Sequence, residues 1–172
     1  MLKFVLNNGN PWGKQLPDCM VRVPCIALNM SYLEVCRVYG IPCKDGEGIY
    51  RDEKLNAKKF VDRFSEYIDD YNFDDFMARR EKILPNIKEW SEEHKNTGRY
   101  MVCLRHSKEM DFLPTYHASC LDTDKMILLD KFDCSNMEVM GYVHFRDDKI
   151  LLNKDPKSRF QHILKKKLKN FS

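Results

Sequence analysis

The sequence predicts an α+β domain in which N-terminal helices pack on a C-terminal antiparallel sheet. Before Gly98, apolar residues recur with the 3.6-residue period of helices, and after Gly98 they alternate with the two-residue period of strands. Helices followed by a run of strands are typical of α+β folds rather than parallel α/β folds. Hydrophobic residues make up 43% and charged residues 32% of the 172 residues, which favours a folded chain over a disordered one.

The first predicted helix covers residues 19–29. Val21, Cys25 and Leu28 repeat at positions i, i+4 and i+7, so they share one face. Pro24 lies inside this helix and has no N–H to donate, so we expect it to bend the helix.

A second predicted helix covers residues 31–39. Ser31 followed by Glu34 forms a capping box, which marks its start. Gly40 and then Pro42 mark its end.

Residues 43–56 contain two glycines and many charges, and they are predicted to be a loop. From residue 57 to about residue 82 the pattern predicts a helix or helix pair, with an interruption near residues 71–75. The shared face consists of Phe60, Phe64, Tyr67, Ile68 and Tyr71. We interpret this aromatic stripe as core rather than as a cofactor site.

Pro85 and Asn86 open another short predicted helix, with Ile87 and Trp90 facing inward. The turn KNTG at residues 95–98 ends it.

The alternating stretches after Gly98 predict a meander of antiparallel strands. They are RYMVCLRH (99–106), YHASCLD (116–122), KMILLDKFD (125–133), VMGYVHF (139–145) and KILL (149–152).

Charge is spread unevenly and suggests one domain with a tail. The chain carries a net +3, but residues 154–172 hold seven Lys/Arg and one Asp, a local +6, which leaves −3 for residues 1–153. We expect residues 1–153 to form a single domain and residues 154–172 a basic C-terminal tail. Only the tail, chiefly residues 157–169, favours a nucleic-acid or anionic-lipid partner.

The cysteines and the N-terminus favour the cytoplasm. The N-terminus has no apolar signal-peptide core, and no window approaches the roughly 18 apolar residues of a membrane span. The seven cysteines are odd in number and irregularly spaced, so we expect thiols rather than disulfides. Without a Cys-x-x-Cys pair we expect no structural zinc site, and Cys103 and His106 are interpreted as plain strand residues. We expect no cofactor.

One predicted hairpin carries a candidate acid–base pair. If Thr123 and Asp124 form a two-residue turn, His117 lies opposite Asp130. The same register pairs Asp122 with Lys125, Cys120 with Ile127, and Ala118 with Leu129. A carboxylate beside a histidine fixes the imidazole tautomer and leaves the other ring nitrogen to face a nucleophile.

Cys19 is the candidate nucleophile because a thiol in the first turn of a helix is activated by the backbone N–H groups there. Its thiolate could attack an acyl carbon while the His117 imidazolium protonates the leaving amine, which gives a thioester. The alternatives are a buried structural thiol for Cys19 and a backbone-bonded strand histidine for His117. Asp133 is the alternative to Asp130, although cross-strand geometry favours Asp130.

The order of these residues resembles that of the papain-like cysteine peptidases, in which a helix-start Cys is followed by a distant strand His and then by an Asn or Asp ending the next strand. Asp130, Lys131 and Phe132 resemble the Asn-Ser-Trp run of classical members. The stretches DCMVRVPCIALNMSYLEVCRVYG, GRYMVCLRH and YHASCLDTDKMILLDKFDCSN are more closely similar to small, mostly uncharacterised papain-like proteins of bacteriophage genomes. The resemblance covers most of residues 15–143.

The resemblance implies a papain-like fold and a cysteine peptidase or amide-bond hydrolase with a Cys19–His117–Asp130 triad. It implies an oxyanion hole made by the Cys19 backbone N–H and a side chain. Gln15 lies four residues before Cys19, whereas the classical Gln lies five or six before, so Asn10 is a second candidate. Other departures are Pro24 in the helix and Phe132 in place of Trp.

The resemblance also implies a protein or peptide substrate, a viral or mobile-element origin, and residence in the host cytoplasm. A catalytically inactive papain-like protein that binds or inhibits a host component is the alternative from another class. Oligomeric state is not predicted by the sequence.

Overall fold

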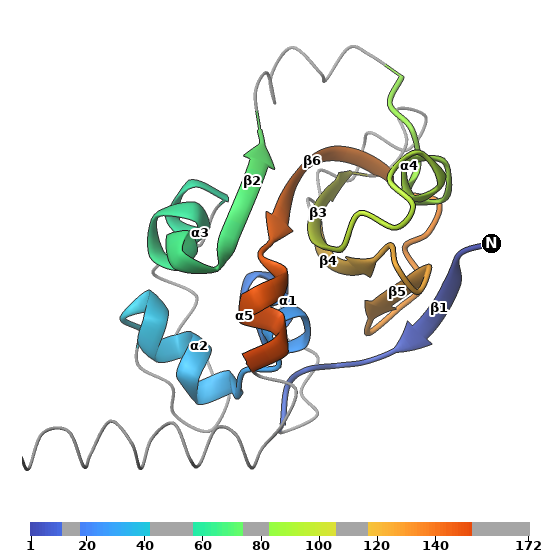
Figure 1. Ribbon diagram of the computed structural model, residues 1–172. Coiled ribbons are helices and arrows are strands. Elements are labelled where there is room, and N and C mark those ends of the chain that lie inside the picture. The colour runs from blue at the N-terminus through green and yellow to red at the C-terminus, as the bar shows by residue number, and fades with distance from the viewer. Residues whose placement is uncertain (12–17, 42–56, 74–82, 106–116, 153–172) are drawn as a thin grey trace, which may run out of the picture.

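The computed structural model describes residues 1–11, 18–41, 57–73, 83–105 and 117–152 (Figure 1), and in them the chain is α+β, as predicted. The helices are α1 (Cys19–Leu28), α2 (Tyr32–Tyr39), α3 (Ala57–Phe64), α4 (Ile87–Glu93) and α5 (Asp147–Leu152). The strands are β1 (Lys3–Leu6), β2 (Ile68–Asn72), β3 (Arg99–Arg105), β4 (His117–Asp122), β5 (Ile127–Asp130) and β6 (Glu138–Phe145). The predictions for the 43–56 loop, for Gln15 and for the 154–172 tail lie outside the described residues.

The strands form one mixed sheet in the order β1-β5-β4-β3-β6-β2. The β5-β4, β4-β3, β3-β6 and β6-β2 pairs are antiparallel. Antiparallel pairing was predicted for β3, β4, β5 and β6. Three features were not predicted. Strand β2 joins the sheet beside β6. Strand β1 pairs in parallel with β5 at one edge, and β6 pairs with β3 rather than continuing a meander beside β5.

Helix α1 continues through Pro24, and a hydrogen bond from helix α2 compensates for the missing N–H of the proline. In a regular helix the N–H at position 24 would bond the carbonyl oxygen of Met20, and proline has no such N–H. The Tyr39 hydroxyl of α2 donates to that carbonyl oxygen at 2.8 Å. Helix α2 thereby satisfies the backbone group that Pro24 leaves without its helical partner.

Helix α2 begins and ends at the predicted residues. Ser31 caps it, and the reciprocal bonds of the capping box with Glu34 are both present. Gly40 ends it with a φ of 71°, a left-handed conformation that glycine adopts without steric cost. Helix α4 likewise starts with a capping box, from Asn86 to Glu89, and buries its predicted inward face.

The predicted helix was wrong for residues 65–73, and residues 74–82 lie outside the described part of the chain. Phe60 and Phe64 of α3 stack in the core, but Ser65–Tyr67 form one 3₁₀ turn and the chain then enters β2. Ile68 and Tyr71 suit a strand as well as a helix, and pairing with β6 decides between them. The predicted strand at 149–152 was also wrong, because these residues end α5, whose first turn carries Asp147 and Asp148. Acidic residues there favour a helix through its dipole.

Two apolar clusters cover the two faces of the sheet. Side chains alternate along β3 and β4, so neighbouring residues belong to opposite clusters. Met101, Ala118 and Cys120 join the cluster with α1, α2 and α3, and Val102, Leu104 and Leu121 join the cluster with Ile87 and Trp90 of α4. Helix α1 therefore packs directly on β4 and β3 (Figure 1), which carries its first residue to the start of β4.

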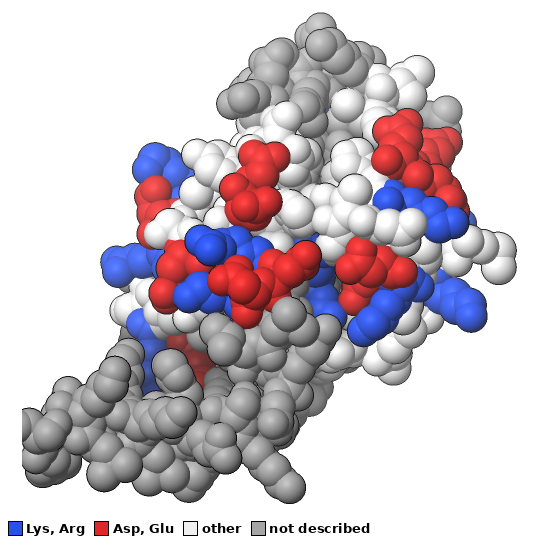
Figure 2. Space-filling model, viewed as in Figure 1, with Lys and Arg blue, Asp and Glu red and all other residues white. Residues whose placement is uncertain are grey.

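Two surface observations bear on partners. No single described helix has the length and apolar character to cross a membrane; α1 and α2 reach that measure only together, across a bend of 117°. On the face shown in Figure 2, the described acidic and basic side chains are interspersed rather than gathered by sign. This part of the surface is not the basic patch that a nucleic-acid partner would need.

Candidate active site

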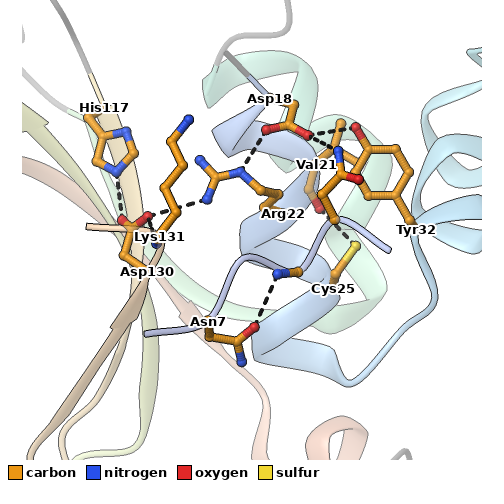
Figure 3. A network of polar contacts seen from close by, with 11 residues as sticks. Asn7, Asp18, Val21, Arg22, Cys25, Tyr32, His117, Asp130 and Lys131 are labelled. Carbon is orange, nitrogen blue, oxygen red and sulfur yellow. Dashed lines mark hydrogen bonds and ion pairs between the residues drawn. The ribbon is translucent and has the colours of Figure 1, made fainter. Parts of the chain in front are cut away.

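The candidate site lies where the β4–β5 hairpin ends and helix α1 begins. His117 is the first residue of β4, Asp130 is the last residue of β5, and Cys19 is the first residue of α1. Figure 3 shows the Asp130 carboxylate between His117 and the Arg22 side chain of α1. The structure thus brings the predicted nucleophile, base and orienting acid to one end of the sheet.

The register of the hairpin differs from the prediction. Cys120 pairs with Leu129, whereas a two-residue turn would pair it with Ile127. The connection is four residues long, from 123 to 126, and Met126 has a φ of 54°. A two-residue hairpin turn favours Asn or Gly, which tolerate positive φ, and Thr-Asp is not such a pair. The predicted two-residue turn was therefore wrong.

His117 and Asp130 nevertheless share one face, because the register shift equals the two-residue period of a strand. They are diagonal rather than directly opposed. His117 Nε2 lies 2.6 Å from Asp130 Oδ2, and the ring of Phe132 lies at 4.7 Å from the His117 ring, centroid to centroid. Nε2 contacts the carboxylate, so Nδ1 is the ring nitrogen left for another partner.

Burial and partners act on the pKa of His117 in opposite directions. Burial lowers it, but hydrogen bonds with Asp130, Cys134 and Cys19 outweigh burial and raise the pKa of His117 to about 11. Burial raises the pKa of Asp130, yet the hydrogen bond and charge of His117, with the Lys131 backbone N–H, hold it below its usual value. The two side chains therefore form an imidazolium–carboxylate pair at neutral pH.

Cys19 has a lowered pKa although its thiol is largely shielded from water. Burial raises the pKa of Cys19, but the hydrogen bond and charge of His117, then a bond with the Ala118 backbone and the charge of Arg22, outweigh it. Burial raises the pKa of the other thiols with resolved shifts in the described part of the chain, which are Cys25, Cys103, Cys120 and Cys134.

Sequence reasoning missed Arg22. Its side chain is buried and bonds the carboxylates of Asp18 and Asp130 (Figure 3), at 2.6 Å and 3.3 Å. The available signal was an Asp–Arg pair at i, i+4 on a helix whose surrounding residues are apolar, because such a position forces the charges to find partners inside.

The other candidate side chains are placed as follows. Asp133 is exposed, and its carboxylate accepts the Ser135 backbone N–H at 3.0 Å, so in the structure it serves a local turn. Asn10 is buried, and its side-chain amide donates to Asp18 Oδ2 at 3.0 Å. Asp18 is the residue that precedes Cys19 in the chain. Gln15 lies outside the described residues.

One group in the described residues has metal-ligating atoms close together. His117, Asp130 and Cys134 each offer one such atom, and these lie within 4.8 Å of one another. His, Asp and Cys are ligands that zinc accepts. The Asp130 carboxylate, however, already bonds His117 and the permanently charged Arg22 guanidinium, and this cation opposes a second one.

Comparison of the chain with family models, with curated proteins and with solved structures finds no match. The chemistry of the site therefore has to be argued from its own geometry. A thiol with a lowered pKa, bonded to an imidazolium that a buried carboxylate orients, can act as a nucleophile with an adjacent proton donor.

Proposed function

We propose that the chain is a papain-like cysteine peptidase or amide-bond hydrolase with Cys19 as nucleophile, His117 as acid and base, and Asp130 as the residue that orients His117. One observation carries the proposal: His117 is hydrogen-bonded to Cys19 on one side and to Asp130 on the other. This is the arrangement that covalent acyl transfer needs, with nucleophile, base and orienting group in contact.

The proposed reaction starts from the Cys19 thiolate and the His117 imidazolium. The Cys19 thiolate attacks the carbonyl carbon of the substrate amide, and the imidazolium gives its proton to the nitrogen as the C–N bond breaks, which releases an amine and leaves a thioester. Neutral His117 then takes a proton from water as the water attacks the thioester. The carboxylic acid product leaves as the C–S bond breaks, which restores the Cys19 thiolate. His117, which holds the proton taken from water, is again an imidazolium.

The oxyanion needs donors at the start of α1. The backbone N–H of Cys19 is one candidate, as the first residue of the helix. Gln15 and Asn10 remain the side-chain candidates. In the conformation described, Asn10 is engaged with Asp18, so it could serve only after turning away from that carboxylate.

The resemblance to bacteriophage proteins supports a viral or mobile-element origin. On that basis we extend the proposal to a protein or peptide substrate in the cytoplasm of a host cell. We assign no substrate pocket to the described residues, because residues 12–17 and 106–116, which are close to Cys19 and His117 in sequence, lie outside the described part.

A peptide-library assay tests the hydrolase directly. The full chain is incubated with the library, and Cys19→Ala and His117→Ala variants serve as matched controls. We expect new peptide termini that need both residues, together with a thioester on Cys19 that hydroxylamine removes. Cleavage that persists in the Cys19→Ala variant would contradict the assignment of the nucleophile.

The engagement of Asn10 favours a second candidate, a papain-like protein that binds a host component without turnover. Such a protein would lack a complete oxyanion hole. A p-nitrophenyl ester separates the two functions, since a hydrolase releases nitrophenol continuously after an initial burst. A binding protein would at most give a single burst and retain the acyl group on Cys19.

A further inference from the structure

Arg22 lies inside the molecule, although an arginine side chain stays charged in proteins. Its side chain is 2% exposed and sits on α1 among apolar neighbours. Nε bonds Asp18 Oδ1 at 2.6 Å, and Nη1 bonds Asp130 Oδ1 at 3.3 Å. The two carboxylates come from segments more than 100 residues apart in the chain, one from the start of α1 and one from the end of β5.

These contacts close a ring around the candidate site. Asp18 precedes Cys19 in the chain, and Cys19 contacts His117. Figure 3 shows the rest of the ring, in which His117 contacts Asp130 and Arg22 joins Asp130 back to Asp18. We propose that Arg22 is a positioning residue of the site: its guanidinium fixes the helix start that carries Cys19 against the strand end that carries Asp130. This inference rests on the proposed function.

The Asp130 carboxylate shows what the bridge does on the strand side. Oδ1 accepts Arg22 and the Lys131 backbone N–H, at 3.3 Å and 2.6 Å, which turns Oδ2 toward His117. A carboxylate held at both oxygens cannot rotate away from the imidazole. The bridge thereby keeps His117 directed at the thiol without touching a substrate.

The Asp18 carboxylate shows what the bridge does on the helix side. Asp18 occupies the N-cap position of α1, yet its side chain makes no capping bond and instead accepts Arg22, Tyr32 and Asn10. A negative charge next to Cys19 would repel a thiolate. The Arg22 guanidinium neutralises that charge. The Val21 and Arg22 N–H groups of the first turn bond the Asp18 backbone carbonyl oxygen rather than its carboxylate.

A purely structural ion pair is the competing explanation. Arg22 Nη2 is buried and has no hydrogen-bond partner among the described residues, so the guanidinium is incompletely satisfied. An unsatisfied buried donor costs stability, and stability alone is a poor reason to retain such a group. The matched control is Arg99, which joins the other end of α1, through the Ala27 carbonyl oxygen, to Asp122.

The test is the pH midpoint of iodoacetamide alkylation of Cys19 in the full chain. The titratable or charged groups near this thiol in the described part are His117, Arg22, Asp18, Tyr39 and Cys103. We expect Arg22→Met to raise the midpoint by about one pH unit or more, because a cation near the thiolate is lost while two carboxylates stay. Arg99→Met should leave the midpoint within about 0.3 units even where it lowers the melting temperature as much.

Arg22→Lys keeps the inference testable if Arg22→Met does not fold. A lysine keeps the charge but cannot form two bonds in fixed directions, so we expect a midpoint between those of the wild type and Arg22→Met. An alkylation midpoint equal to that of the wild type, in Arg22→Lys or in a folded Arg22→Met, would contradict the positioning role of Arg22. If instead Cys19 of the wild type is not selectively alkylated, or its alkylation does not need His117, the proposed function itself is contradicted.

Discussion

The pKa values of two cysteines on one helix are shifted in opposite directions. Cys19 opens α1 and has a lowered pKa, whereas Cys25, less than two turns further along, has a raised one. Burial acts on both thiols in the same direction, because removing a thiolate from water always costs free energy. The difference therefore comes from partners and not from depth in the protein.

The partners of the two thiols are chemically unlike. The Cys25 thiol donates a hydrogen bond to the Val21 carbonyl oxygen at 3.1 Å, which suits a neutral thiol. Cys19 meets the His117 imidazolium, a group that stabilises only the thiolate. The two thiols therefore differ in that the hydrogen bond and charge of His117 act on Cys19, whereas no partner outweighs the effect of burial on the pKa of Cys25.

The largest expected effect comes from His117→Ala, which should make Cys19 behave like Cys25. Without the imidazolium, only the Ala118 backbone bond and the Arg22 charge oppose the effect of burial, which is the largest cause, so we expect the pKa of Cys19 to rise. We expect the alkylation rate of Cys19 at pH 6.5 to fall by at least about 100-fold. Cys25 in the same sample is the internal control, and equal rates for the two thiols in urea would show that the difference belongs to the folded state. A rate that stays near the wild-type value would refute the ion pair.

Asp130→Asn should have the next largest effect, because it leaves His117 and Arg22 buried without their shared anion. We expect the free energy of unfolding in urea to fall by about 3 kcal/mol at neutral pH. The pKa of Asp130 is lowered from 3.8, so its contribution is present above that value and is lost as the pH falls through the folded pKa. The gap between wild type and variant should thus narrow below about pH 4.

Asp133→Asn is the matched control for that variant. Asn accepts the Ser135 backbone N–H as well as Asp does, so the free energy of unfolding should change by less than about 0.5 kcal/mol. A larger loss of the free energy of unfolding from Asp133→Asn than from Asp130→Asn would mean that Asp133, and not Asp130, is the anion that compensates His117 and Arg22.

Tyr39→Phe tests the part of α1 that separates the two thiols. It removes the donor to the Met20 carbonyl oxygen, and we expect a loss of about 1–2 kcal/mol in the free energy of unfolding. In a Pro24→Ala background the new N–H of residue 24 can bond that carbonyl, so the same change should cost less than about 0.5 kcal/mol. Equal costs in both backgrounds would mean that Tyr39 does not compensate for the proline.

Phe132→Ala should have the smallest effect. The ring contacts His117 but is 41% exposed, so it shields the His117–Asp130 bond from water only in part. We expect the alkylation rate of Cys19 to fall by less than about threefold at neutral pH, measured beside Phe132→Trp, which keeps an aromatic cover. A fall in the alkylation rate as large as that expected for His117→Ala would assign the orientation of His117 to the ring rather than to the carboxylate.

The elements that could be predicted from the sequence are those whose signals are local. The capping box at Ser31 and the Pro85-Asn86 pair marked two helix starts correctly, and period-two alternation marked β3 and β4. Ile68–Asn72 could not be assigned in this way, because only pairing with β6 makes it a strand. Strand β1 is likewise a short segment that β5 alone stabilises.

The candidate site was likewise predictable where it depends on strand periodicity, and not where it depends on contacts between distant segments. An error of two residues in the hairpin register did no harm to the His117–Asp130 pairing, since strands repeat every two residues. Arg22 was missed because its role depends on a contact across 108 residues, which no local pattern records. Only the folded structure shows that the Arg22 charge is compensated by the carboxylates of Asp18 and Asp130.

The most direct test of the account is pH-dependent labelling of all seven thiols at once. The folded protein is treated with limiting iodoacetamide from about pH 5 to about pH 9, and the modified residues are mapped by mass spectrometry. We expect Cys19 to be modified first near neutral pH, at least about tenfold faster than Cys25, and only when His117 is present. A Cys19 that reacts no faster than Cys25, or that is protected until the protein unfolds, would contradict the account.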